Sequence, residues 1–352
     1  MIKVLVADDS AIARTMIKQI ISEDGRMEFA GYAENGERAV IQNSLLKPDL
    51  IIMDINMPII NGIEATRKIL KTSNPAIVAF TTEDMALVGY KCIGAGALEV
   101  IRKPSLAVMN KSELKQFCDR IYEIGINHKK INDSKNTKAP QESGLLKRAF
   151  DMACAGSKKY KLLVVGASTG GPAAIQTLLL QIGSNFPLPI LITQHIDSLF
   201  DTHFAAWLNS TTGVKVEIAK NKTVPEKGTA YIAPSDFHLT ICRNPDPEKC
   251  TILLTKEPPI HFLRPAVDKL FFSAAQVFSD KVIAVLLTGM GKDGADGCKA
   301  IFDAGGLTIA ESEETCTVFG MPKAAIEEKS IKEVLPLNEI AAFLKKETGD
   351  LL

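Results

Sequence analysis

The stretch LLVVGASTGGP at residues 162–172 decides the fold of the larger part of this 352-residue chain. Its first four residues are apolar without interruption, which is typical of a parallel strand buried on both faces. The glycines that follow allow a tight turn, and Pro172 suits the first turn of a helix. A buried strand that leads through a glycine turn into a helix predicts a doubly wound parallel sheet, with the Ser168 hydroxyl raised above the sheet edge.

Two functions are compatible with this turn. Residues 166–170 fit the glycine-x-serine-x-glycine pattern, in which the serine is a nucleophile and neighbouring backbone N–H groups stabilise an oxyanion. Alternatively, the turn could cradle a phosphate at the start of the helix, although the dinucleotide fingerprint has glycine where Ser168 stands. The turn alone does not separate a hydrolase from a phosphate-binding domain.

The composition bounds the class of protein. Lys plus Arg and Asp plus Glu both number 41, and the resulting net charge of zero argues against bulk attraction to nucleic acid or to an anionic membrane. No apolar stretch has the length of a membrane span, and Met1 leads directly into a predicted strand, so we expect a cytoplasmic protein without membrane insertion. The seven cysteines include no Cys-x-x-Cys pair, which favours reduced thiols over disulfides or a zinc site.

Short apolar runs alternate with helix-like segments through residues 1–125, which predicts a parallel sheet covered on both faces. These runs span residues 3–7, 50–53, 76–80 and 100–101. Polar residues, Pro and Gly dominate residues 127–144, as is typical of a linker, and residues 145–154 have the pattern of a short amphipathic helix. We therefore place a first domain at residues 1–125, a linker at 126–158 and a second domain at 159–352.

The second domain repeats the alternation on a larger scale, so the predicted class is α/β, with two doubly wound parallel-sheet domains. Its predicted strands span residues 162–165, 189–194, 214–218, 229–233, 252–254, 282–288 and 307–310. Helical spacing fills much of the intervening sequence, for example at residues 265–278 and 338–346. This domain is larger than a helix-turn-helix module and has no basic stripe, which argues against a DNA-binding output domain.

Charged side chains follow three strands of the first domain. Asp8 and Asp9 follow the first strand, Asp54 follows the third, and Lys103 follows the last. Because the carboxyl ends of parallel strands meet at one edge, the carboxylates would repel one another unless a hard cation such as Mg²⁺ neutralised them. Each aspartate alone is more simply a helix N-cap. The whole set with Lys103 favours a phosphoacceptor site, since phosphoryl transfer needs mainly positioning and charge neutralisation.

On these motifs and their order, residues 3–123 resemble the receiver domain of two-component response regulators. The resemblance implies a flavodoxin-like fold in which Asp54 is the phosphoacceptor and Thr81 and Lys103 are switch residues. The Mg²⁺ ligands that it implies are Asp9, Asp54 and the carbonyl oxygen of Asn56, with Asp8 close by. Many receivers have an aromatic residue three positions before this lysine. Val100 stands there in this chain, so an aromatic switch does not carry over.

A nucleophilic serine needs a base and an orienting acid from elsewhere in the chain. His195 directly follows the next apolar strand, which puts it at the same sheet edge as Ser168. Asp293 lies in the glycine-rich turn of residues 289–294, after the most apolar strand, and Asp296 is a weaker competitor. Taken singly, the histidine could be structural and Asp293 could be a helix N-cap. The shared placement of all three side chains after strands favours a catalytic triad.

The two turns also supply backbone donors. The N–H groups of Thr169 and Met290 are the predicted oxyanion donors, because each lies in a turn that carries a predicted catalytic residue. The chain order Ser-His-Asp differs from the order Ser-Asp-His of α/β-hydrolases, so the chemistry does not imply that fold.

Five segments of the second domain look like the catalytic domain of chemotaxis methylesterases. These segments are residues 166–171, 194–195, 264–268, 288–294 and 318–322. Together with the receiver, the whole chain resembles the chemotaxis response-regulator methylesterases. The resemblance implies Ser168, His195 and Asp293 as the catalytic triad, with no cofactor in the catalytic domain. A receiver-controlled nucleotide-binding domain is the alternative, but it has no use for the histidine or the aspartate.

The same resemblance implies the partners. The substrate would be a glutamate γ-methyl ester on the cytoplasmic helices of a chemoreceptor, and the histidine kinase of the chemotaxis array would phosphorylate the receiver. Some members of this family also deamidate receptor glutamines. Phosphorylation of Asp54 is then expected to control the esterase.

Overall fold

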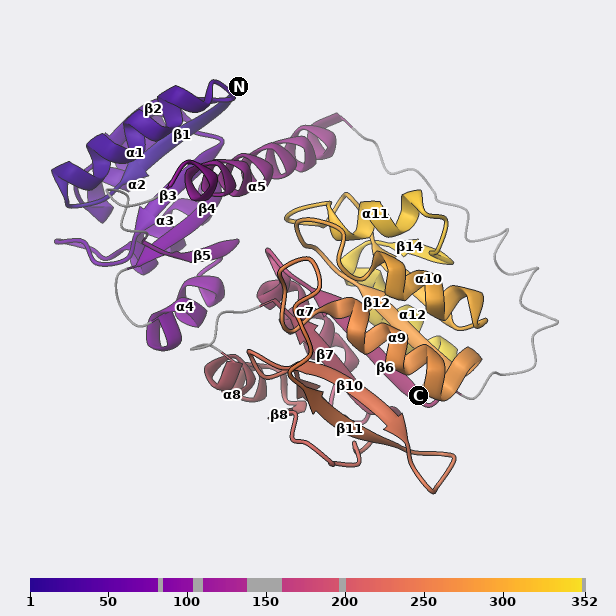
Figure 1. The fold of residues 1–352 in the computed structure, drawn as a ribbon. Coiled ribbons are helices and arrows are strands. Elements are labelled where there is room, and N and C mark those ends of the chain that lie inside the picture. Colours follow the sequence, from indigo (N-terminus) through magenta and orange to yellow (C-terminus); the bar gives the residue numbers. More distant parts are fainter. Residues whose placement is uncertain (82–84, 104–109, 138–159, 196–200, 350–352) are drawn as a thin grey trace. The chain divides into compact units, whose positions relative to one another are not determined.

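The computed structural model describes residues 1–81, 85–103, 110–137, 160–195 and 201–349 (Figure 1). The chain divides into two compact units, Met1–Asn132 and Asp133–Leu352. Across the described ranges, no helix combines the length and the apolar character that crossing a membrane requires.

The first unit is a five-stranded parallel sheet with the order β2-β1-β3-β4-β5. Its strands are β1 (Ile2–Ala7), β2 (Met27–Ala33), β3 (Leu50–Asp54), β4 (Ala76–Thr81) and β5 (Glu99–Arg102). Its helices are α1 (Ala11–Asp24), α2 (Gly36–Leu46), α3 (Gly62–Leu70), α4 (Met85–Gly94) and α5 (Lys111–Thr137). The chain runs outward from β1 to β2 and then crosses to β3 on the other side of β1. The carboxyl ends of β1 and β3 therefore form a switch point, where such sheets bind ligands.

Helix α5 corrects the predicted linker. The helix continues through residues 126–137, which the composition predicts to be a linker. Polar side chains of this stretch bond to the first unit: His128 Nε2 and the Asn132 amide each lie 2.9 Å from the carbonyl oxygen of Asn74. The polar residues of this stretch therefore include side chains that bond to the loop before β4, and they do not mark a linker. The rest of the predicted linker, including the helix predicted at 145–154, lies outside the described residues.

The second unit is built on a seven-stranded parallel sheet with the order β14-β13-β12-β6-β7-β9-β8. Its strands are β6 (Leu162–Ala167), β7 (Ile190–Gln194), β8 (Lys215–Ile218), β9 (Thr229–Ile232), β12 (Val282–Leu286), β13 (Leu307–Glu311) and β14 (Glu333–Leu335). The chain leaves β6 toward β7 on one side and returns at β12 on the other, so β6 and β12 form the switch point. Two parallel sheets confirm the predicted fold class.

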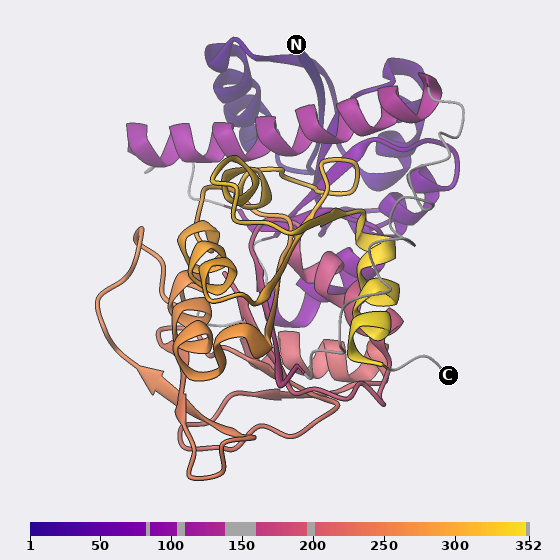
Figure 2. The ribbon, with the colours of Figure 1, turned by 90° about the vertical axis from the view of Figure 1, so that its right-hand side faces the viewer.

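Helices cover both faces of the larger sheet. They are α7 (Gly171–Ile182), α8 (Asp201–Thr212), α9 (Val267–Phe278), α10 (Ala295–Asp303), α11 (Met321–Glu327) and α12 (Leu337–Thr348), with the 3₁₀ helix η2 (Ser279–Lys281) after α9. α7 packs against α8 and α12, α9 packs against α10, and the two groups lie on opposite sides of the sheet (Figure 2). Apolar residues of β6, β12, α9 and α10 share one core, which fixes the positions of the loops that follow β6 and β12.

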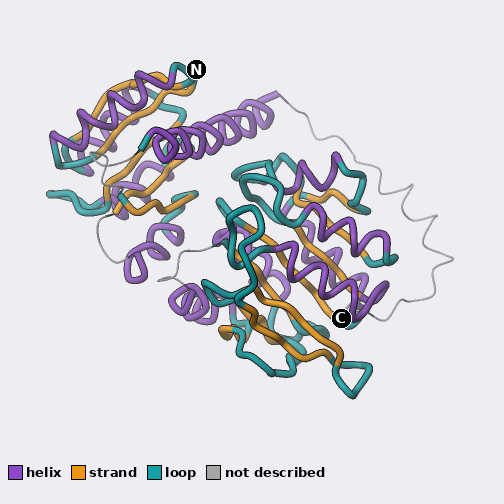
Figure 3. The backbone as a smooth tube through the Cα atoms, viewed as in Figure 1, coloured by secondary structure: helices purple, strands orange, loops and turns teal. Residues whose placement is uncertain are grey.

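An antiparallel ribbon interrupts the parallel pattern. Strands β10 (His238–Arg243) and β11 (Cys250–Thr255) pair with each other, and β10 packs against α9 (Figure 3). The apolar run at 252–254 predicts β11, whereas β10 has no such run. β10 begins with a histidine and then alternates buried with partly exposed residues, so its signal is weaker.

Candidate active site

Ser168, His195 and Asp293 lie in the loops that follow three strands of the second unit, at the carboxyl edge of the sheet. Ser168 directly follows β6, and His195 directly follows β7. Asp293 lies in the turn between β12 and α10. Because β6 pairs with β7 on one side and with β12 on the other, these three residues meet at the switch point of the sheet.

A short hydrogen bond joins the histidine to the aspartate. His195 Nε2 lies 2.7 Å from Asp293 Oδ2, and the two side chains are 9% and 1% exposed. Asp296, the competing aspartate, is exposed in the first turn of α10. The geometry therefore pairs the histidine with Asp293 in preference to Asp296.

Asp293 remains a carboxylate although it is buried. Val267 N–H donates to Oδ2 at 2.7 Å and Asp268 N–H donates to Oδ1 at 3.0 Å, both from the start of α9. Burial alone would raise the pKa of Asp293, but the hydrogen bond and charge of His195 and these two N–H groups outweigh burial and lower the pKa. The aspartate can therefore stabilise a positive charge on the histidine ring.

The ring orientation of His195 decides which of its two nitrogens could accept a proton. Neutral imidazole carries one proton, and the Nε2 proton is donated to Asp293. Nδ1 is then the free acceptor, which is the reverse of the arrangement in chymotrypsin-like triads. Among the described residues no hydrogen bond joins Ser168 Oγ to this ring, as is common for catalytic groups without bound substrate.

The serine turn is held by backbone and side-chain contacts. Ser168 N–H donates to the Thr288 carbonyl oxygen at 3.0 Å, and Gln194 Nε2 donates to the Ser168 carbonyl oxygen at 2.8 Å. A Cβ atom at Gly171 would lie 2.0 Å from Gln194 Oε1, so only glycine lets the glutamine approach. Gly170 takes a φ of +76°, whereas the backbone of Ser168 is not left-handed. The left-handed position of this turn is therefore Gly170 and not Ser168.

The predicted oxyanion donors are available. In the part of the chain that the structure describes, the N–H groups of Thr169 and Met290 have no acceptor, whereas Gly289 N–H donates to the Val318 carbonyl oxygen. Met290 is 39% exposed, and Thr169 is buried. The two free donors belong to the turns that follow β6 and β12.

The first unit gathers a second set of predicted residues at the carboxyl ends of β1 and β3. Oxygen atoms of Asp8, Asp9 and Asp54 lie within 4.8 Å of one another. Lys103 Nζ lies 2.5 Å from Asp8 Oδ2 and 3.0 Å from Asp54 Oδ2. Thr81 is buried at the end of β4. An all-oxygen donor set of this kind suits a hard divalent cation.

Burial and the positive charge of Lys103 act in opposite directions on the pKa of Asp54. Burial raises the pKa of Asp54 and the neighbouring charge of Asp8 adds to the rise, while the hydrogen bond and charge of Lys103 oppose it. Burial lowers the pKa of Lys103, but its bonds to both aspartates outweigh burial and raise it. Asn56 N–H donates to Asp54 Oδ1 at 3.4 Å, so Asn56 lies beside the predicted phosphoacceptor.

Two family models match the chain: the CheB methylesterase model over residues 163–344, and the response regulator receiver domain model over residues 4–116. The chain belongs to the CheB methylesterase family. A protein-glutamate methylesterase/protein-glutamine glutaminase of Colwellia psychrerythraea is 37% identical over 98% of this chain and 98% of its own length. The protein of the same name from Thermotoga maritima is 37% identical over 96% of each chain. The crystal structure of the Thermotoga maritima CheB methylesterase catalytic domain is 41% identical, has a TM-score of 0.52, and covers 53% of this chain and 98% of that domain.

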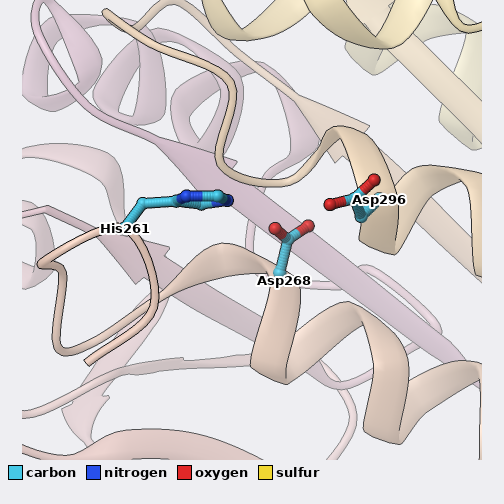
Figure 4. Close-up of side chains that lie close together, drawn as sticks. All are labelled: His261, Asp268 and Asp296. Carbon is cyan, nitrogen blue, oxygen red and sulfur yellow. The ribbon is translucent and has the colours of Figure 1, made fainter. Parts of the chain in front are cut away.

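A further cluster of titratable side chains lies in the second unit of this CheB-family chain (Figure 4). His261, Asp268 and Asp296 point toward one another, and their nitrogen and oxygen atoms lie within 4.8 Å. Asp268 is buried, and the other two side chains are exposed.

Asp268 bonds to backbone groups at the end of the turn that carries Asp293. Its Oδ1 accepts Gly294 N–H at 2.9 Å and Gly297 N–H at 2.7 Å. Burial and the charge of Asp293 raise the pKa of Asp268 to about 7. In the sequence, Asp268 lies within one of the segments that resemble methylesterases, but the pattern indicates no role for it. Its partners are backbone N–H groups 26 and 29 residues later in the chain.

Proposed function

We propose that this chain is a phosphorylation-controlled protein-glutamate methylesterase that removes methyl groups from glutamate γ-methyl esters on the cytoplasmic helices of chemoreceptors. The observation that carries the proposal is the 2.7 Å bond between His195 Nε2 and Asp293 Oδ2, beside the turn that holds Ser168. A phosphate-binding turn has no use for a buried histidine–carboxylate pair, so the pair favours a serine hydrolase. Relatives that match nearly the whole chain carry the corresponding name.

The reaction proceeds through an acyl-enzyme. Ser168 attacks the ester carbonyl carbon while His195 Nδ1 takes the hydroxyl proton, and Asp293 stabilises the resulting imidazolium. The N–H groups of Thr169 and Met290 donate to the oxyanion. His195 then gives the proton to the departing methoxide oxygen, and methanol leaves. Water, deprotonated by the same histidine, hydrolyses the acyl-enzyme to a glutamate carboxylate and free serine.

The same machinery suits a glutamine side chain, and this is a second candidate activity because the relatives are also named protein-glutamine glutaminases. Attack of Ser168 on the amide carbonyl would release ammonia, with the proton supplied by His195. The acyl-enzyme is the same in both reactions, so water yields the same glutamate product.

Asp54 is the phosphoacceptor in this proposal, and the histidine kinase of the chemotaxis array is the partner that phosphorylates the chain. The clustered oxygen atoms of Asp8, Asp9 and Asp54 fit a hard cation, so these residues and the Asn56 carbonyl would hold Mg²⁺. When bound, the ion would neutralise charge on the carboxylates and on the phosphoryl group.

Control of the esterase follows from the charge that phosphorylation adds. The phosphoryl group on Asp54 would take up hydrogen bonds from Lys103 and Thr81, which lie at the ends of neighbouring strands. The unphosphorylated contact of Lys103 with Asp54 would then be replaced, which shifts the population between a less active and a more active form. Because the proposed kinase and the receptor helices are both cytoplasmic, the proposal also gives this chain a cytoplasmic location.

The test is methanol release from methylated cytoplasmic fragments of a chemoreceptor, measured with and without a small phosphodonor such as acetyl phosphate. A fluorophosphonate should label the wild-type protein at Ser168 and should not label Ser168→Ala. A folded wild-type protein that neither releases methanol nor takes the label would contradict the proposed function and favour a binding turn.

A further inference from the structure

Glu311, the last residue of β13, is fully buried, and no step of the proposed reaction uses it. Its Oε2 atom accepts the backbone N–H of Thr288 at 2.8 Å. Burial raises the pKa of Glu311 to about 7, although the hydrogen bond from Thr288 opposes the rise. A carboxyl group is costly to place in a core, so its contacts should explain why it is there.

Thr288 links Glu311 to the nucleophile turn through its other polar groups. Its carbonyl oxygen accepts Ser168 N–H at 3.0 Å, and its hydroxyl donates to the Thr169 carbonyl oxygen at 2.9 Å. The same hydroxyl accepts Val318 N–H at 2.9 Å. Thr288 is only 1% exposed, so water does not compete for these bonds.

The link also reaches the second oxyanion donor. Gly289 follows Thr288 and donates its N–H to the Val318 carbonyl oxygen at 3.0 Å. Met290, whose N–H has no acceptor among the residues that the structure describes, comes next in the chain. A displacement of Thr288 would therefore move both predicted oxyanion donors and the serine backbone together.

We propose that Glu311 is a positioning residue for the serine nucleophile. Its carboxyl oxygen fixes the backbone of Thr288, and Thr288 fixes Ser168 and Thr169. The inference rests on the proposed function, since it takes Ser168 as the nucleophile. Without the acceptor, Thr288 N–H would be buried and unpaired, so the turn would shift to satisfy it. A misplacement of about 1 Å can lower a rate by about 100-fold.

Three variants of the full chain test the proposal by methanol release from methylated receptor fragments. Glu311→Leu keeps the volume but removes the acceptor, and it should lower kcat by about 10- to 100-fold with KM unchanged. Glu311→Gln keeps an acceptor oxygen for Thr288 and should stay within about threefold of the wild-type kcat. Thr308→Val is the matched control: it lies on the same strand, and its hydroxyl bonds to the Ser330 carbonyl oxygen, away from the nucleophile turn. It should retain the wild-type kcat.

Circular dichroism establishes that each variant is folded before its rate is compared. A wild-type kcat in Glu311→Leu, or an equal loss in Glu311→Gln, would overturn the positioning role. If Glu311→Leu does not fold, Glu311→Asp takes its place, because it keeps the carboxyl group but shortens the side chain by one methylene and so weakens the bond to Thr288 N–H. The proposal then requires a lower kcat for Glu311→Asp than for Glu311→Gln, and equal values would overturn it.

Chemical labelling of Ser168 separates a wrong substrate from a wrong role for Glu311. If the wild-type protein releases no methanol from receptor fragments, the substrate is wrong. The rate of fluorophosphonate labelling of Ser168 then replaces kcat, because it reports serine reactivity without a receptor. Equal labelling rates in the wild type and Glu311→Leu would overturn the positioning role.

Discussion

Asp293→Asn tests the triad most sharply, because Asp293 accepts hydrogen bonds on both carboxylate oxygens. Oδ2 accepts from His195 Nε2 and from Val267 N–H, each at 2.7 Å, and Oδ1 accepts from Asp268 N–H at 3.0 Å. Asparagine offers one acceptor oxygen and one NH₂ group in the same space. Whichever way the amide is turned, at least one backbone N–H then faces another donor.

Both orientations of the amide impair the reaction. If the NH₂ group faces His195, Nε2 must accept, the ring proton moves to Nδ1, and the ring cannot take the Ser168 proton. If the amide oxygen faces His195, the tautomer is correct, but the imidazolium loses its neighbouring negative charge. We expect kcat to fall by roughly 10⁴-fold, which corresponds to about 5 kcal/mol of transition-state stabilisation.

Methanol release from methylated receptor fragments measures this loss, and circular dichroism shows whether the variant is folded. Asp296→Asn is the matched control, because Asp296 is an exposed carboxylate in the first turn of the following helix. It should retain nearly the full rate. A folded Asp293→Asn protein with more than about a tenth of the wild-type rate would refute the triad assignment, as would a larger loss in Asp296→Asn.

Substitutions at Ser168, Asp54 and Glu311 test the proposed nucleophile, the receiver and the buried acid. Ser168→Ala should abolish methanol release while the protein stays folded, and near-normal release would exclude this serine as the nucleophile. Asp54→Asn should abolish the rise in rate that acetyl phosphate produces, and an undiminished rise would place the phosphoacceptor elsewhere. The pKa of Glu311 is about 7 in the folded protein against an ordinary 4.5, so the unfolded chain loses this proton first and stability should fall as pH rises between those values. The loss is at most about 3 kcal/mol, and urea unfolding as a function of pH measures it. Glu311→Gln should have a shallower slope, because Asp268, whose pKa is also raised to about 7, still contributes to it, and an identical slope in both proteins would contradict the assignment.

The placement of Ser168, His195 and Asp293 at one sheet edge could be predicted because the ends of the strands can be recognised in the sequence. Apolar runs predict β6, β7 and β12, and parallel pairing brings the residues that follow them to one edge. The structure places Asp293 within 2.7 Å of His195, in agreement with its position in the glycine-rich turn. In the first unit, Asp8, Asp54 and Lys103 likewise follow or end parallel strands, and they lie in contact at one sheet edge.

The supporting residues could not be predicted, because their partners are backbone groups far along the chain. Glu311 bonds to the N–H of Thr288, 23 residues earlier, and in the sequence it is only the end of an apolar run. Asp268 bonds to the N–H of Gly294, 26 residues later. The ring orientation of His195 likewise depends on where Asp293 comes to lie, and no local pattern encodes it.

The length of α5 shows what composition alone does not predict. Composition identifies polar segments but does not separate residues that face solvent from residues that bond to another part of the protein. The polar side chains of His128 and Asn132 bind the carbonyl oxygen of Asn74, which lies 54 and 58 residues earlier in the chain. Their polarity resembles that of a linker, although the backbone is helical.

The strand order β12-β6-β7 bears on when activity can arise during protein synthesis. Ser168 and His195 follow consecutive strands, whereas Asp293 lies 98 residues beyond His195. Contacts of such long range form late in folding, and the N-terminal part of a chain leaves the ribosome first. A nascent chain that ends before β12 carries the proposed nucleophile and base but lacks both the proposed acid, Asp293, and the proposed oxyanion donor, Met290. Incomplete chains should therefore be inert toward esters, and hydrolysis should begin only once β12 has docked beside β6.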